Sequence, residues 1–143
     1  MNREAIISAL FTLVSNAASF ANSSRRLRLW SSVASSEKPA LFLVERADVY
    51  TRGNEAAPET VTMQLEIYIY TDAGKDQSIV PSSSLNPLID AVEAALAPSR
   101  LTGLQTLGGL VSHCWIEGRL MKDAGDLDGD GVAVIPMKIL VPR

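Results

Sequence analysis

Apolar and polar side chains alternate strictly in residues 59–71, ETVTMQLEIYIYT, and this stretch limits the possible folds more than any other. A β-strand repeats every two residues, so the alternation predicts a strand with one face on a core and the other partly polar. The chain therefore needs a sheet and a layer that covers the apolar face of that sheet. The predicted core positions are Val61, Met63, Leu65, Ile67 and Ile69; the opposite face carries Thr62, Gln64, Glu66, Tyr68 and Tyr70.

Helical periodicity predicts two helices. In residues 3–17 the apolar side chains Ile6, Leu10, Leu13, Val14 and Ala17 fall on one helical face, and Asn2 is a candidate N-cap. The same stretch has the length of a signal peptide, but its acidic and hydroxyl side chains favour an amphipathic helix. Residues 82–97 predict the second helix, with Ser84 or Asn86 as its cap, Pro87 in its first turn and Pro98 at its end.

Further strands are predicted at residues 26–33, 40–50, 111–122 and 131–141. In the last strand both faces are largely apolar, and Pro136 cannot donate a ladder hydrogen bond, which places it at an edge or a bulge. The predicted fold class is α+β, a mainly antiparallel sheet with two helices packed on one face. We expect one such domain over residues 1–143.

Composition points toward assembly. Of the 143 residues 47% are hydrophobic and only 20% charged, which favours a chain that covers part of its surface with a partner; a monomer with a large core remains the alternative. The net charge of −3 argues against binding nucleic acid over the whole surface, although Arg25, Arg26 and Arg28 form a short basic stretch. The single Cys114 excludes an internal disulfide and fits a reducing compartment. No apolar run approaches the ~20 residues of a membrane-spanning helix.

The acidic stretch DLDGDG begins like a calcium-binding EF-hand loop, with Asp126, Asp128 and Asp130 at its first, third and fifth positions. The glutamate expected at the twelfth position is replaced by Met137, and a strand is predicted where a helix should follow. Asp and Gly are also the residues that tight turns prefer. We expect a turn between strands, and a weak divalent-ion site at these aspartates stays as an alternative.

No catalytic set is apparent. His113 and Cys114 are adjacent on a predicted strand, so their side chains leave opposite faces and cannot act as a base and nucleophile pair. Two glycine-containing stretches lack the complete phosphate-loop pattern. We predict no catalytic and no cofactor-binding residues. The candidate interface residues are Tyr68, Tyr70 and Trp115, because aromatic side chains on a polar face are typical of protein interfaces; coverage by this same chain is the alternative.

Several segments together resemble the tail terminator proteins (also called minor tail or tail completion proteins) of long-tailed bacteriophages and phage-tail-like particles. They are REAIISALFTLV, RLRLW, VTMQLEIYIYT followed by LNPLIDAVEAAL, and GDGVAVIPMKILVP. The resemblance covers most of the chain and lies in the order and character of the elements.

The resemblance implies a non-enzymatic virion structural protein, assembled in the host cytoplasm and located in the tail or neck. Such a protein would form a ring of six copies, cap the tail tube, end tail polymerisation and present a surface for head–tail joining. Its partners would be other copies of itself, the tail tube protein and a head–tail connector, without a membrane. DNA would pass through without sequence readout. The loops around residues 50–60 and 71–77 are candidates for reaching neighbouring rings. The alternatives are another neck or tail-tube protein, a small divalent-ion-binding module, and an enzyme that uses His113.

Overall fold

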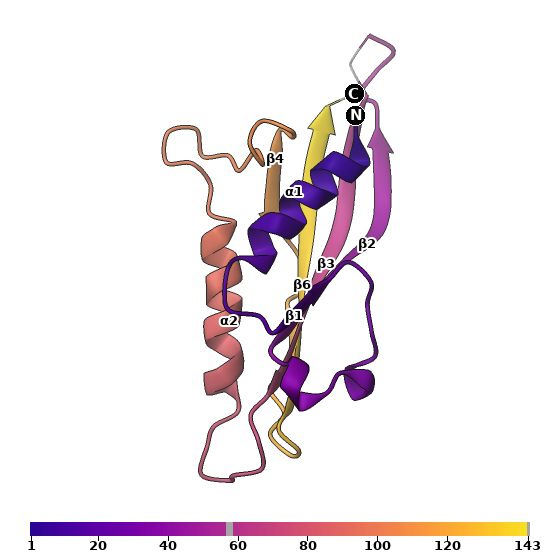
Figure 1. Ribbon diagram of the computed structural model, residues 1–143. Helices are drawn as coiled ribbons and strands as arrows, with labels where there is room; N and C mark the ends of the chain where they lie inside the picture. The colour runs from indigo at the N-terminus through magenta and orange to yellow at the C-terminus, as the bar shows by residue number, and fades with distance from the viewer. Residues whose placement is uncertain (57–58, 143) are drawn as a thin grey trace.

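A computed structural model describes residues 1–56 and 59–142 and shows two helices beside one twisted sheet (Figure 1). The helices are α1 (Arg3–Ser15) and α2 (Ser82–Ala95), with short 3₁₀ turns at Trp30–Ser32 and Ser35–Glu37. The strands are β1 (Asn22–Ser24), β2 (Ala40–Thr51), β3 (Thr60–Asp72), β4 (His113–Ile116), β5 (Met121–Asp123) and β6 (Asp130–Pro142). Within this described part, no helix is both long and apolar enough to span a membrane.

Three long strands form the body of the sheet. The strand order is β1-β2-β3-β6-β4, and β5 pairs with β6 on the same side as β4. β1 runs parallel to β2, and every other pairing is antiparallel. β3 pairs with β6 from Thr60↔Pro142 to Asp72↔Asp130, so the last strand lies in the middle of the sheet.

Both helices cover one face of this sheet, which confirms the predicted α+β class. The predicted core positions of β3 are all buried, as are Ile6 and Leu10 of α1 and Leu85 and Ile89 of α2. Asn2 caps α1 as predicted, because its side-chain oxygen accepts a hydrogen bond from the Ala5 amide at 3.1 Å.

The predicted cap of α2 is wrong. The helix begins at Ser82 with Pro81 as its N-cap, so Pro87 lies inside the helix rather than in its first turn. Asn86 instead accepts a hydrogen bond from the ammonium group of Lys122. The helix ends at Ala95, shortly before Pro98, as the sequence predicted.

Residues 25–39, which we call the strap, cross one end of the other sheet face. They cover a second, smaller core of Val33, Ala40, Phe42 and Tyr70. The predicted strand at 26–33 is therefore wrong, and the short strand β1 lies before it. The guanidinium of Arg28 explains the difference, because it bonds both the carboxylate of Glu37 and the carbonyl of Ser32 and holds this stretch in turns.

Pro136 lies at a break in the outer pairing of β6. The expected strand at 111–122 is divided into β4 and β5, which pair with β6 on either side of Pro136. At the break, the amide of Glu117 donates to the carbonyl of Pro136 at 3.2 Å. The carbonyl group and the backbone nitrogen of a strand residue point to the same side of the strand. The nitrogen of Pro136, which carries no hydrogen, therefore also faces the gap between β4 and β5. The prediction of an edge or a bulge is therefore wrong as stated, because β6 is a central strand whose register with β3 is unbroken; Pro136 is accommodated at the gap between β4 and β5.

Candidate interaction surfaces

The strap leaves much of the second sheet face uncovered, and we call this part the open face. Two ion pairs cross it, Arg46–Glu66 and Lys138–Glu117. Between and around these pairs lie side chains that are half-buried or exposed rather than packed under another layer. They are Val44, Tyr68, His113, Trp115, Met121, Val134, Pro136 and Leu140.

The three aromatic candidates differ in their accessibility. Tyr70 is 4% exposed because the strap covers it, and its hydroxyl donates to the carbonyl of Arg28 at 2.7 Å. It therefore offers no free surface, contrary to our expectation. Tyr68 is half-buried on the open face and accepts a hydrogen bond from Arg46 at 2.6 Å. Trp115 is also half-buried there and stacks on His113, with 5.0 Å between the ring centroids.

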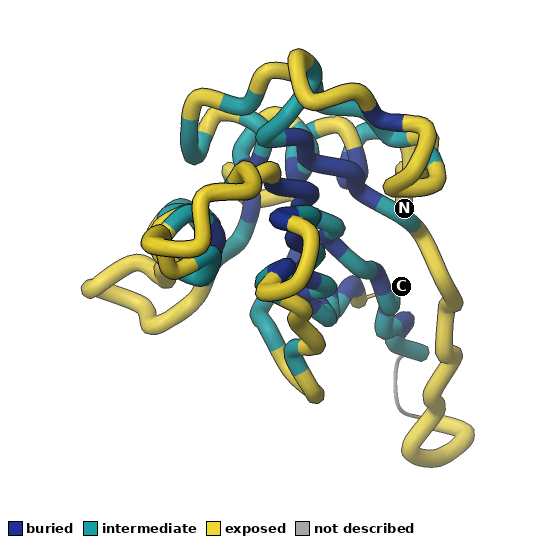
Figure 2. Tube along the Cα trace, turned by 90° about the horizontal axis from the view of Figure 1, so that it is seen from below, coloured by how far each residue is buried: buried dark blue, intermediate teal, exposed yellow. Residues whose placement is uncertain are grey.

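The distal end of the β2–β3 hairpin, residues 46–56 and 59–60, projects from the body, and we call it the arm. Every β2 residue of the arm, from Arg46 to Thr51, is exposed, and the arm stands clear in Figure 2. The outer edge of β2 pairs with β1 only at 40–42 among the described residues, so its remaining length is open. A bulge between Glu45 and Ala47 interrupts its register with β3. Arg3 of α1 bonds Asp48 and the Tyr50 hydroxyl on the arm, yet every β2 residue of the arm stays exposed, so the hairpin keeps surface for a further contact.

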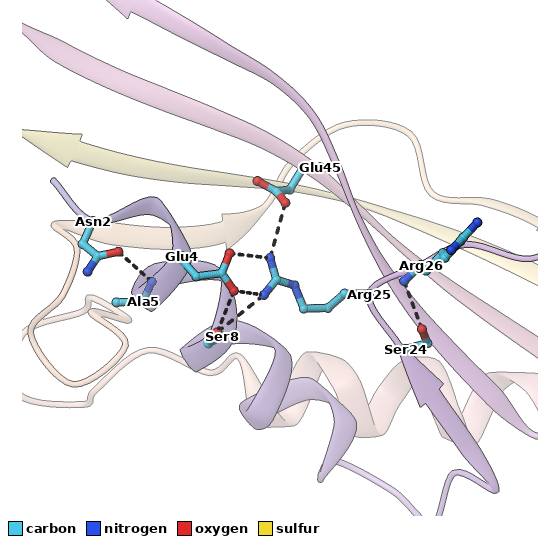
Figure 3. A network of polar contacts seen from close by, with 8 residues as sticks. All are labelled: Asn2, Glu4, Ala5, Ser8, Ser24, Arg25, Arg26 and Glu45. Atoms are coloured by element: carbon cyan, nitrogen blue, oxygen red, sulfur yellow. Dashed lines mark hydrogen bonds and ion pairs between the residues drawn. The ribbon is translucent and has the colours of Figure 1, made fainter.

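A charge network joins α1, the strap and β2. The guanidinium of Arg25 bonds the carboxylate of Glu4 and lies 3.5 Å from that of Glu45 (Figure 3). The Arg25 contact lowers the pKa of Glu4, mainly through the side-chain hydrogen bond. Figure 3 shows the Arg26 side chain pointing away from this network. Because Arg25 and Arg28 are neutralised within the chain, the basic stretch offers only Arg26 to a partner.

The three aspartates of the acidic stretch do not converge. The carboxylate of Asp130 pairs with the ammonium of Lys38 at 3.0 Å, and Asp128 accepts from the amide of Asp130. The described residues contain no group of three or more His, Cys, Asp or Glu side chains placed to hold a metal ion. Residues 124–129 connect β5 to its neighbour β6, which confirms the predicted turn between strands.

A pocket of about 590 Å³ lies at the end of β3, and its polar lining residues include Ser35, Lys38, Asp72 and Ser84. The hydroxyl of Thr71 also lines it and is buried without a hydrogen-bond partner among the described residues. Hydrogen bonds from Ser35 and from the amide of Gly74 lower the pKa of Asp72. These groups suit bound water, which would supply the partner that the Thr71 hydroxyl lacks.

His113 and Cys114 point to opposite sides of β4. Cys114 is buried in the main core, and burial raises the pKa of its thiol to about 11. His113 lies on the open face, where its Nδ1 accepts from the amide of Gln105 at 3.1 Å. The thiol is therefore protonated at neutral pH and has no base beside it, so the two residues do not form a nucleophilic pair.

Sequence reasoning missed two exposed surfaces. The strap presents Arg26, Leu27, Leu29 and Trp30 to solvent. We had predicted a half-buried strand in this segment from its Arg/Leu alternation. The outer side of α2 presents Asp90 and Glu93, which form no ion pair within the described ranges. Their three-residue spacing places them on one helical face and was the available signal.

Comparisons with known proteins give little further guidance. No protein-family model matches the chain, and no curated protein matches it either. One similar solved structure is described as the virion of a native gene transfer agent (GTA) particle. The sequences are 13% identical, the match covers 94% of this chain and 84% of that chain, and the TM-score is 0.49. At this identity and this score the likeness does not identify a function.

Proposed function

We propose that this chain is a non-enzymatic structural protein of a phage-like virion, a tail terminator that acts in the tail or neck. In this role, copies of the chain form a ring on the end of the tail tube. The ring ends tail polymerisation and offers its outer surface to the head–tail connector. DNA passes through the ring without sequence readout.

The observation that carries the proposal is the surplus of contact surface. The arm is exposed along its β2 strand, the outer edge of β2 is largely unpaired, and the open face keeps aromatic and aliphatic side chains in partial contact with solvent. A monomer gains nothing from these three features, whereas a subunit of an assembly covers them. The resemblance of the sequence to tail terminators supports the specific role.

The described side chains add no competing chemistry. The thiol is buried, the imidazole accepts a backbone hydrogen bond, and two of the three aspartates of the acidic turn, Asp128 and Asp130, bond groups of their own chain. These arrangements stabilise the fold, and they support a role carried by surfaces rather than by a reactive centre.

Two measurements test the proposal. Light scattering on a sizing column, with calcium and then with EDTA, should give a mass of several subunits that does not depend on calcium. Deleting the chain from the particle that encodes it should leave tails of irregular length without joined heads. Tails of normal length, joined to heads in the absence of this chain, would contradict the role. A mass that changes with calcium would favour the divalent-ion module instead.

A further inference from the structure

One side of the strap forms an exposed apolar ridge beside a free cation. Leu29 is 75% exposed and Trp30 is 46% exposed, although the strap buries Val33 on its inner side. Arg26 lies next to them and forms no ion pair among the described residues. Trp and Arg are the side chains that dominate binding energy at protein interfaces. The ridge, residues 26–30, therefore has the composition of a contact surface.

The outer face of α2 has the complementary character. Asp90 and Glu93 are exposed there and form no ion pair in the part of the chain that the structure describes. Pro87, Ala94 and Ala97 are exposed around them, and none of these side chains is long. This face is thus an acidic patch on a shallow surface, which a bulky apolar ridge can approach closely.

These two surfaces lie on opposite flanks of the molecule. In Figure 1, α2 is at the left of the sheet and the strap is at the right, beyond β1. Figure 2, which keeps the same horizontal axis, places α2 at the left again. Because the two surfaces differ and belong to elements on opposite flanks, one copy can use both at once, each with a different neighbour. A contact of this kind is heterologous and generates a ring or a filament.

We propose that copies of this chain associate head to tail, with the ridge of one copy, residues 26–30, on the outer face of α2 of the next. Arg26 pairs with Asp90 and Glu93 of the neighbour, and Leu29 and Trp30 pack over Pro87 and Ala94. The inference rests on the proposed function, because a ring requires such a contact. It goes further by naming the two surfaces and the charges that match them.

Charge reversal tests the contact. Arg26→Glu places a carboxylate opposite two others and should weaken self-association on the order of a hundredfold. The double variant Asp90→Arg with Glu93→Arg should weaken it similarly. Combining all three substitutions restores the opposite charges and should recover most of the affinity. Arg100→Glu makes the same change of charge at an exposed residue outside the ridge, the arm and the open face; it is the matched control and should associate as the wild type does. Sedimentation equilibrium at low salt gives the affinities.

The fold should survive these substitutions, because none of the three charged groups has an ion-pair partner within the described chain; thermal melting checks this. A wild type that stays monomeric at its highest soluble concentration would overturn the inference. So would a full association of Arg26→Glu, or a triple variant as weak as the single ones. If the charge swap behaves as expected while tails lacking the chain are normal, the contact stands and the proposed function fails. If the triple variant does not recover its affinity while tails lacking the chain are irregular, the proposed function stands and this contact is wrong.

Discussion

The ammonium group of Lys38 lies 3.0 Å from a carboxylate oxygen of Asp130, and only 5% of the lysine side chain is exposed. The pair joins the end of the strap to the start of β6, across 92 residues of sequence. It therefore fixes the strap to the sheet and uses an aspartate that the calcium-loop pattern would have assigned to a metal.

Asp130→Asn should destabilise the fold by about 1–3 kcal/mol, because it leaves a buried ammonium without its counter-charge. Urea unfolding measures the change. Asp126→Asn is the matched control, since Asp126 is exposed, and its unfolding should match the wild type. Calcium should leave the melting temperature of the wild type unchanged, and a clear rise with calcium would contradict the geometry described for this turn.

Tyr70→Phe should cost about 0.5–1.5 kcal/mol, because it removes the bond from the hydroxyl to the Arg28 carbonyl and leaves the ring in place. The amides of residues 30–37 should then exchange hydrogen faster, since this bond holds the strap on the sheet. Tyr68→Phe is the control, as its hydroxyl lies outside the strap. Equal exchange in the strap for both variants would refute this function of Tyr70.

Burial raises the pKa of the Cys114 thiol from 9.0 to about 11, which makes stability depend on pH. The folded thiol holds its proton more tightly than the unfolded one, so this contribution is fully present below pH 9. It is lost as the pH rises through about 11, with a total on the order of 2–3 kcal/mol. Cys114→Ala should be less stable than the wild type at neutral pH. Its free energy of unfolding should, however, fall less than that of the wild type as the pH rises above 9. Parallel pH curves for the two proteins would argue against it.

Gly129→Ala should destabilise the fold by about 2–4 kcal/mol, through backbone strain and a clash. Gly129 has a φ of +85°, and an added Cβ would lie 2.2 Å from the carbonyl oxygen of Gly74. Gly103→Ala separates the two causes, because Gly103 has a φ of +70° but nothing within 4 Å of such a Cβ. Chemical denaturation should show a much smaller loss for Gly103→Ala. Equal losses would mean that the close approach to Gly74 is unimportant.

The sequence predicted the elements in which one periodicity dominates. The alternation around β3 and the helical spacing of α1 reflect burial directly, so both were read correctly. The strap was misread because the Leu/Arg alternation there does not reflect a sheet. Arg28 bonds within the strap, and Leu29 points to solvent. The start of α2 was misread because Pro87 is typical of a first turn, yet the helix begins five residues earlier.

The candidate interface was only partly predictable. Tyr68 and Tyr70 are equivalent in the sequence pattern, since both lie on the polar face of the same strand. Their different exposure depends on where the strap crosses the sheet, which a distant tertiary contact decides and no local pattern records. The charged and apolar residues of the α2 face and of the ridge can be identified in the sequence. Only the fold shows that the two surfaces lie on opposite flanks of the molecule.

The position of β6 has a consequence for the order of events in the cell. β6 is the last strand of this sheet to be synthesised, yet it lies between β3 on one side and both β4 and β5 on the other. Before it emerges, β2 and β3 can form only a hairpin, and β4 and β5 have no strand to pair with. Nascent chains therefore cannot present a finished subunit to one another. The fold itself therefore separates the translation of this domain from its assembly as a finished subunit.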